Sequence, residues 1–409
     1  SVFTPEAVKK VTLFKSSFPA RFGGRLSSVI DVRTNDGDMQ KYHGTFSIGL
    51  LTSKINLEGP IIKGKTSFNI SARRSYLDLL AKPFMPDDEK YSYYFYDMNA
   101  KINHKFSDRS RMFLSAYHGK DHFAADYDGN TDFKDGSNMG WGNTIVSARW
   151  NYIFNNRLFS NTTVSYNNYL FDVNTYTNNQ YSTGAGAIIL NRYSSNYHSG
   201  ITDWSYQIDF DYNPTPAHHI KFGTGYLFHR FQPDVTTSVI SDKTDNRIDR
   251  DTTYHNANNS RIHAHEVTAY AEDNFKIGSR LRLNLGLHLS LFHVQDQNYL
   301  SLQPRISARY QLNKDITIKA SYTKMNQYVH LLPIAMPTDL WVPVTKKIKP
   351  MRSHQYALGG YYTGINGWEF SVEGYYKDMR NVLEYKDGVS FFGSSSGWEN
   401  KVEMGKGRS

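Results

Sequence analysis

Hydrophobic and polar residues alternate along most of this chain, most plainly from Leu281 to Leu291. Every odd position in this stretch is leucine, and the positions between hold arginine, asparagine, glycine, histidine and serine. Successive side chains of a strand point to opposite faces, whereas a helix would scatter the leucines around its axis. The pattern therefore predicts a strand with one leucine face. That face meets either the dry core of a soluble sandwich or lipid.

The same period of two recurs in residues 146–154, 204–212, 316–323 and 368–374. In each stretch one face is apolar and largely aromatic or branched, while the other carries full charges such as Asp209, Lys319 and Glu373. An unpaired charge is costly to bury, so a sandwich core would not accept the second faces. A soluble sandwich with one wet face still fits any single strand.

The connections between these stretches favour a membrane barrel over a sandwich. Short turns are expected near 63–65, 107–109, 155–157, 214–216, 278–280, 313–315 and 364–367. Long polar loops are expected at 75–93, 121–141, 174–198, 233–261 and 328–351, and only the connection at 295–300 is short. Tight turns that alternate with long loops are typical of outer-membrane barrels. We therefore predict an all-β protein, a transmembrane antiparallel β-barrel.

Composition agrees with this prediction. Hydrophobic residues make up 39% of 409 residues and mean hydropathy is −0.58, yet aromatic residues reach 15%, with 30 tyrosines. Such a balance suits a wall with one apolar band and aromatic girdles. No apolar run is long enough for a membrane-spanning helix. The net charge of +9 is spread along the chain, which favours a solvated surface or lumen over a nucleic-acid interface.

The first 36 residues differ from the rest. Residues 4–10 predict a short helix entered through Pro5, and strands are predicted at 11–15 and 29–34. Gly23, Gly24 and Arg25 lie between these strands, where two glycines permit positive φ or a close backbone approach.

This part carries a recognisable sequence, EAVKKVTLFKSSFPARFGGRLSSVIDVRTNDG. It resembles the end of the plug domain of TonB-dependent outer-membrane transporters, in the branch common among Bacteroidetes-type bacteria. YHGTFSIGLLTSKINLEGPI and KTSFNISARRSYLD resemble that branch's first barrel strands, and LQPRISARY, PTDLWVP and VEGYYKDMRNVLEY its later ones.

The resemblance implies that residues 1–36 are the C-terminal end of a plug and 37–409 the first two-thirds of a barrel. Complete plugged barrels have roughly 22 strands, and about fifteen are expected here. We expect these strands not to close alone. Gly23, Gly24 and Arg25 would form the last turn of the plug.

The family's function would be energy-coupled uptake of a large or scarce nutrient across the outer membrane, without covalent chemistry. TonB would act through a segment outside this sequence, and the wall would contact outer-membrane lipid. The alternative is a scaffold that holds surface lipoproteins in a larger envelope complex. No nucleic acid partner, enzyme motif or cofactor is indicated.

Three groups of residues are candidate sites. Arg73 is expected to face the lumen, where it contacts the plug or a loop, water, or an anionic ligand. The segment 328–351 is the most apolar long loop, so its Leu340 and Trp341 pack at the barrel mouth or meet a ligand or partner. Alternating oxygen ligands suggest a calcium loop, although the usual twelfth-position Glu is missing; they are Asp126, Asp128, Asn130 and Asp132.

Overall fold

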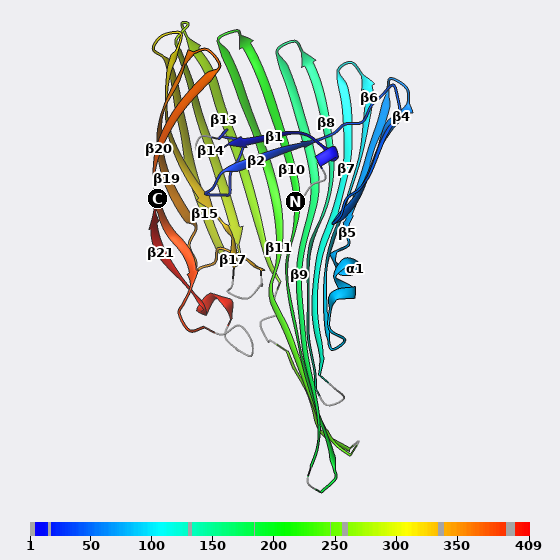
Figure 1. Cartoon of the computed structure of the whole chain (residues 1–409). Coiled ribbons are helices and arrows are strands. Elements are labelled where there is room, and N and C mark those ends of the chain that lie inside the picture. Colours follow the sequence, from blue (N-terminus) through cyan, green and yellow to red (C-terminus); the bar gives the residue numbers. More distant parts are fainter. Residues whose placement is uncertain are drawn as a thin grey trace.

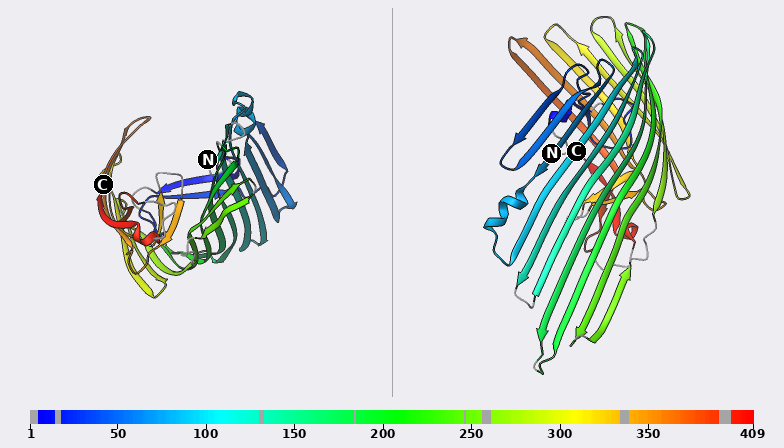
Figure 2. Two further views of the ribbon diagram at one scale, coloured as in Figure 1. Left: turned by 90° about the horizontal axis from the view of Figure 1, so that it is seen from below. Right: turned by 90° about the vertical axis from the view of Figure 1, so that its right-hand side faces the viewer.

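The computed structural model describes residues 5–14, 18–129, 133–183, 185–245, 247–255, 261–333, 339–389 and 397–409. Most of them form one large antiparallel sheet, whose curved wall surrounds a lumen, and two small two-stranded sheets (Figures 1 and 2). The prediction of an all-β barrel is confirmed. Among the described residues, no helix is long and apolar enough to cross a membrane.

The first small sheet belongs to what we call the N-terminal segment, residues 5–36. A 3-10 turn, η1 (Pro5–Ala7), leads into β1 (Val8–Phe14), which pairs with β2 (Val29–Thr34). The structure confirms the predicted bounds of β2. The helix expected over 4–10 is wrong, because Val8 and Lys10 join the ladder with β2 instead.

The wall strands have the following bounds: β3 (His43–Ile48), β4 (Thr52–Ile62), β5 (Thr66–Ser75), β6 (Glu89–Ser107), β7 (Ser110–Gly129), β8 (Phe133–Asn155), β9 (Leu158–Ser182), β10 (Ile188–Thr215), β11 (His218–Thr244), β12 (Arg247–His255), β13 (Ile262–Ile277), β14 (Leu281–Val294), β15 (Gln297–Gln311), β16 (Ile316–Gln327), β19 (Met351–Ile365), β20 (Trp368–Tyr385) and β21 (Val402–Arg408). Between them lie the helix α1 (Leu77–Ala81), the 3-10 turns η2 (Lys82–Phe84) and η3 (Trp398–Asn400), and the hairpin of β17 (Val329–Pro333) and β18 (Asp339–Pro343).

The strand order is that of a closed barrel of seventeen strands, in which β21 returns to β3. This ring order departs from the expectation that the strands do not close alone. Residue pairs join successive wall strands from β3 to β21. The strand β11 pairs with β13 along its first part and with β12 along its last part. The residue pairs thus run from β3 to β21, and the sheet order places β21 next to β3.

The leucine-rich strand β14 shows how the wall is oriented. Its leucines are largely exposed on the outside, whereas His288 and Ser290 are buried on the inside. Outward apolar side chains such as these are what a wall in lipid requires. The polar face of the alternating pattern therefore lines the lumen.

The predicted loops at 121–141, 174–198 and 233–261 are largely wrong. Those residues continue the strands β7 to β12, so that β9 has 25 residues and β10 has 28. The long hairpins project well beyond the wall at the end opposite the short turns (Figure 1). Polar residues predominate in these extensions, and apolar ones such as Ile188 to Leu190 stand in a run, so the sequence carries no clear period of two there. The antiparallel ladder nevertheless satisfies their backbone groups.

Candidate functional site

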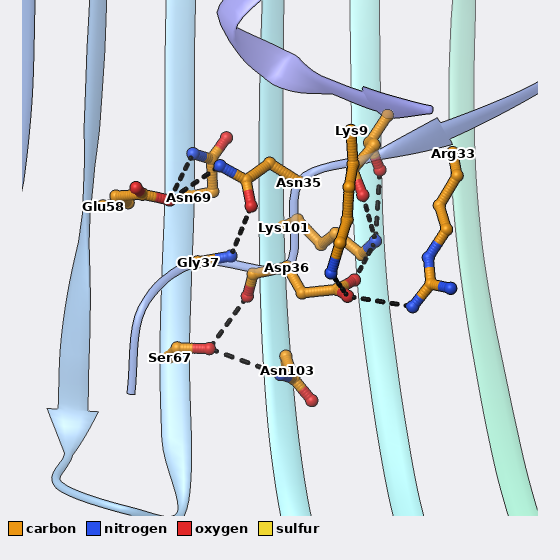
Figure 3. A network of polar contacts seen from close by, with 11 residues as sticks. Lys9, Arg33, Asn35, Asp36, Gly37, Glu58, Ser67, Asn69, Lys101 and Asn103 are labelled. Carbon is orange, nitrogen blue, oxygen red and sulfur yellow. Dashed lines mark hydrogen bonds and ion pairs between the residues drawn. The ribbon is translucent and has the colours of Figure 1, made fainter. Parts of the chain in front are cut away.

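The N-terminal segment lies inside the curved wall (Figure 2), and Asp36 fixes its end to the wall. The Asp36 carboxylate accepts hydrogen bonds from Lys101 at 2.7 Å, Arg33 at 3.1 Å and Lys9 at 3.4 Å (Figure 3). Lys101 comes from β6, and its side chain is only 7% exposed. Burial by itself would raise the pKa of Asp36, but the hydrogen bond and charge of Lys101, with Arg33 and Lys9, hold this pKa below its usual value.

Further hydrogen bonds surround this anchor. Ser67 Oγ donates to the Asp36 carbonyl at 2.8 Å, and Asn35 Nδ2 donates to Glu58 at 2.8 Å (Figure 3). Gly37 has φ +77°, and a Cβ there would lie 2.3 Å from the carbonyl oxygen of Phe68. The chain leaves the lumen at a place where only glycine fits, so the anchor has one defined position on β4 to β6.

The depressed pKa of Asp36 predicts that the anchor weakens in acid. A carboxyl whose folded pKa is lowered stabilises the folded state above its unfolded pKa, about 4, and this stabilisation is lost as pH falls through the folded value. We expect backbone amides 29–36 to exchange slowly at pH 7 and much faster near pH 3, in hydrogen-exchange measurements corrected for intrinsic rates. Asp36→Asn should remove the pH dependence. An acid response unchanged in Asp36→Asn would contradict the assignment.

A second anchor holds residues 19 and 20. The amide of Ala20 donates to Glu272 of β13 at 2.7 Å, and Arg305 of β15 donates to the carbonyl of Pro19 at 2.5 Å. His288 Nδ1 lies 2.8 Å from the carbonyl oxygen of Ala20. A carbonyl only accepts, so Nδ1 carries the proton. Side chains from three wall strands thus form hydrogen bonds with two consecutive peptide groups. These bonds hold the backbone of the segment and involve none of its side chains.

The turn predicted at Gly23, Gly24 and Arg25 lies beside this anchor. A Cβ on Gly23 would be 2.3 Å from Nε2 of His288, so a larger residue does not fit there. Gly24 has φ +73°, a backbone conformation that favours glycine. Arg25 extends into the lumen, and its guanidinium donates to the Gly24 carbonyl at 2.8 Å. The geometry is compatible with a structural turn, and its role in retaining a plug stays a prediction.

Gly23→Val is expected to lower the free energy of unfolding by about 1–3 kcal/mol, since the added side chain displaces the His288 ring from the second anchor. Chemical unfolding of the purified protein measures this. Gly374→Val is the matched control, because a Cβ at Gly374 meets nothing within 4 Å. Equal effects of the two substitutions would disprove the close packing at Gly23.

Acidic and histidine side chains of the wall gather near Arg25. His229 Nδ1 is 2.7 Å from Asp203, and its Nε2 is 3.5 Å from Glu266. His229 and Glu266 are buried. The cluster therefore places two carboxylates around one histidine, near enough to act electrostatically on Arg25 of the N-terminal segment. In the part of the chain that the structure describes, no group of three or more His, Cys, Asp or Glu side chains is arranged to hold a metal ion.

Two of the predicted calcium ligands, Asp126 and Asp128, lie on β7 in the projecting hairpin of β7 and β8. Asp126 accepts a hydrogen bond from the Tyr176 hydroxyl at 3.0 Å, and Asp128 forms an ion pair with Lys134 at 3.0 Å. Asn130 and Asp132 lie outside the described residues. Both described carboxylates have protein partners, and calcium binding stays a prediction.

Arg73 does face inward, but its partner is the wall itself. Its Nε donates to Asp97 of β6 at 2.7 Å, and its guanidinium lies 4.9 Å from the centre of the Phe95 ring. Both charged side chains are nearly buried. This ion pair joins adjacent wall strands, which the alternating pattern alone does not specify. The expected contact of Arg73 with the plug or a loop stays a prediction.

The apolar segment that holds Leu340 and Trp341 folds into the lumen rather than over the mouth. The β17–β18 hairpin packs on an apolar cluster of the inner wall, and Trp341 meets Tyr169 of β9 edge to face at 6.0 Å. Leu340 is 1% exposed. Burial, and then the charge of Arg25, lower the pKa of His330 in the hairpin to about 4, so this ring is neutral at pH 7.

The hairpin is also tied to the N-terminal segment. Gln327, at its base, accepts a hydrogen bond from the amide of Leu26 at 3.3 Å and donates to the Val329 carbonyl at 2.9 Å. Leu26 packs with Phe18 and Met325 in a small buried cluster. The wall, the N-terminal segment and the β17–β18 hairpin therefore meet inside the lumen. Polar contacts join them around the apolar cluster of Phe18, Leu26 and Met325.

Comparisons with known proteins agree on the architecture. The family model described as TonB dependent receptor-like, beta-barrel matches residues 77–409. No curated protein matches the chain significantly. Among solved structures, the ferripyoverdine receptor of the Pseudomonas aeruginosa outer membrane is similar with a TM-score of 0.65 at 13% identity, covering 98% of this chain and 57% of that one.

Two further structures are similar. The ferric preacinetobactin receptor from Acinetobacter baumannii gives a TM-score of 0.59 at 10% identity, over 99% of this chain and 64% of that one. The ferric yersiniabactin uptake receptor from Yersinia pestis gives 0.56 at 12% identity, over 92% and 60%. At such identities the likeness establishes the fold alone, and the chain spans less than two thirds of each structure.

Proposed function

The chain belongs to the TonB-dependent receptor family of outer-membrane β-barrels, and from this premise we propose that it imports a large or scarce nutrient. In this proposal the N-terminal segment is the end of a plug. Cargo enters from the side of the long hairpins, and TonB acts on a segment outside residues 1–409 to loosen the plug. The chemistry is binding and release, gated by a shift between two states.

One observation carries the proposal: polar contacts to the wall hold the N-terminal segment in the lumen, beside one small apolar cluster. Its anchors are the Asp36–Lys101 ion pair and the backbone hydrogen bonds at Pro19 and Ala20. Directional contacts of this kind fix one position, and water can take them over once the segment moves. A gated path needs a segment that is well placed yet removable. The similar receptors that carry ferric siderophores are consistent with a bulky cargo.

A cysteine placed at Leu26 tests the proposal, because this chain contains no cysteine. Leu26 is 5% exposed, so a cysteine there should react slowly with an impermeant maleimide while the plug is closed. In cells we expect faster labelling with an intact proton gradient and TonB than after addition of a protonophore. Tyr254→Cys on the exposed β12 controls for reagent access. Equal rates at Leu26→Cys in both conditions would refute TonB coupling.

A further inference from the structure

Four cations lie side by side on the lumen face of four adjacent wall strands. Lys276 of β13 pairs in register with Arg282 of β14, Arg282 with Arg309 of β15, and Arg309 with Lys319 of β16. Arg282 alternates with the outward leucines of β14, so the row points inward. We call Lys276, Arg282, Arg309 and Lys319 the cationic row.

Such a row is unfavourable for the wall by itself. Side chains directly opposite on neighbouring strands have their Cβ atoms about 5 Å apart, and like charges at that separation repel. No carboxylate forms an ion pair with any of the four in the described part of the chain. All four are exposed. Lys319 alone has a compensating contact, with its Nζ 3.9 Å from the centre of the Tyr361 ring.

The cationic row lines a cavity rather than open wall. This cavity, of about 1500 Å³, lies between the wall at its short-turn end and the strand β1, which contributes Leu13 and Phe14. Arg157, from the turn between β8 and β9, adds a fifth cation to the lining, and Glu373 is the one acid among its lining residues. The carboxylate of Glu373 is engaged by the Tyr361 hydroxyl. The lining thus keeps a large excess of positive charge inside the lumen.

We propose that the cationic row is a binding site for a small solute with two or more oxyanion groups, of the phosphate or carboxylate kind. The two central side chains, Arg282 and Arg309, present planar guanidinium forks that match such groups, with a lysine on either side. The row spans three strand spacings, or about 14 Å, which suits a compact polyanion. Binding of an anion at this site does not depend on whether the protein imports a nutrient. The further statement, that the bound anion is cargo on its way to the periplasm, rests on the proposed function.

Calorimetry on the full-length protein in detergent tests the site with pyrophosphate, citrate and orthophosphate as probes. We expect at least one dianionic or trianionic probe to bind about tenfold more tightly than orthophosphate, because it spans two cations of the row. Preference for pyrophosphate over citrate, or the reverse, identifies the kind of oxyanion. Raising NaCl from 50 to 300 mM should weaken this binding several-fold, since salt screens exposed charges.

Substitutions within the row separate binding from stability. Arg282→Gln with Arg309→Gln should weaken the probe by at least about tenfold. Arg192→Gln with Arg250→Gln, two exposed arginines on the projecting hairpins, removes the same net charge and should leave the affinity unchanged. Arg282→Glu is the sharpest variant. It interrupts the repulsive row, so it should unfold at the same or a higher temperature in low salt, and yet it should lose the probe.

Two results would overturn the inference. One is that no probe binds to the full-length protein in a salt-dependent way. This result is expected if a polypeptide segment, and not a small solute, occupies the cationic row. The other is binding that survives Arg282→Glu. Neither result touches the proposed function, because solution binding requires no TonB. Conversely, labelling of Leu26→Cys that does not depend on energy would refute the proposed function, but it would not affect an anion site shown by calorimetry.

Discussion

Lys101→Met is expected to detach the N-terminal segment from the wall, at a cost of about 3–5 kcal/mol to the free energy of unfolding. Methionine keeps the length of the side chain but leaves the Asp36 carboxylate without its most buried partner. Arg33 and Lys9 remain near Asp36, but their side chains are about half exposed, at 52% and 51%. They therefore compensate less of the buried charge.

Chemical unfolding, together with hydrogen exchange of amides 29–36, measures this loss. The matched control is Lys347→Met, which removes a lysine that is 64% exposed and 3.9 Å from Glu399. A surface pair of this kind is worth about 1 kcal/mol or less. Adding Asp36→Leu to Lys101→Met should restore much of the stability, because no buried charge is then left unpaired. Equal losses in Lys101→Met and Lys347→Met would show that the anchor holds nothing.

Leu340→Asp is expected to drive the β17–β18 hairpin out of the lumen. An unpaired carboxylate in this apolar cluster would cost several kcal/mol. The hairpin has little stability in reserve, because it already buries both ring nitrogens of His330 and Nε1 of Trp341 without hydrogen-bond partners. Expulsion should open the half of the lumen nearest the long hairpins.

Ion conductance of single proteins in planar bilayers, with maleimide labelling of a second-site Val342→Cys, reports the expulsion. We expect faster labelling and larger or more frequent conductance steps in Leu340→Asp. Leu331→Asp is the control on the same hairpin, since Leu331 is 40% exposed. The packed position of the hairpin is wrong if the two variants label at the same rate.

The wall was predictable from sequence because its signal is local. The outward leucines of β14 follow from period two alone, as does the inward direction of Arg73. The projecting hairpins were missed because their sequence is mostly polar and shows no clear period of two. Their strands are held by the backbone ladder, which leaves no trace in the hydrophobic pattern.

The site depends on contacts between residues far apart in the chain. Asp36 and Lys101, or Gln327 and Leu26, carry no local signal that would pair them. The apolar segment around Leu340 and Trp341 was recognised as needing burial, but its sequence does not say on which side of the mouth. The Bacteroidetes-type branch, the division at residue 36 and a surface lipoprotein stay predictions.

Gentle extraction of the full-length protein from native outer membranes, followed by mass spectrometry of what co-purifies at a fixed ratio, tests the central claim most directly. If the protein is an importer, we expect to recover it alone or with a single lipoprotein, together with a small bound molecule that identifies the cargo. Recovery at fixed ratio with an assembly or secretion barrel and several lipoproteins would contradict import and make the chain a scaffold.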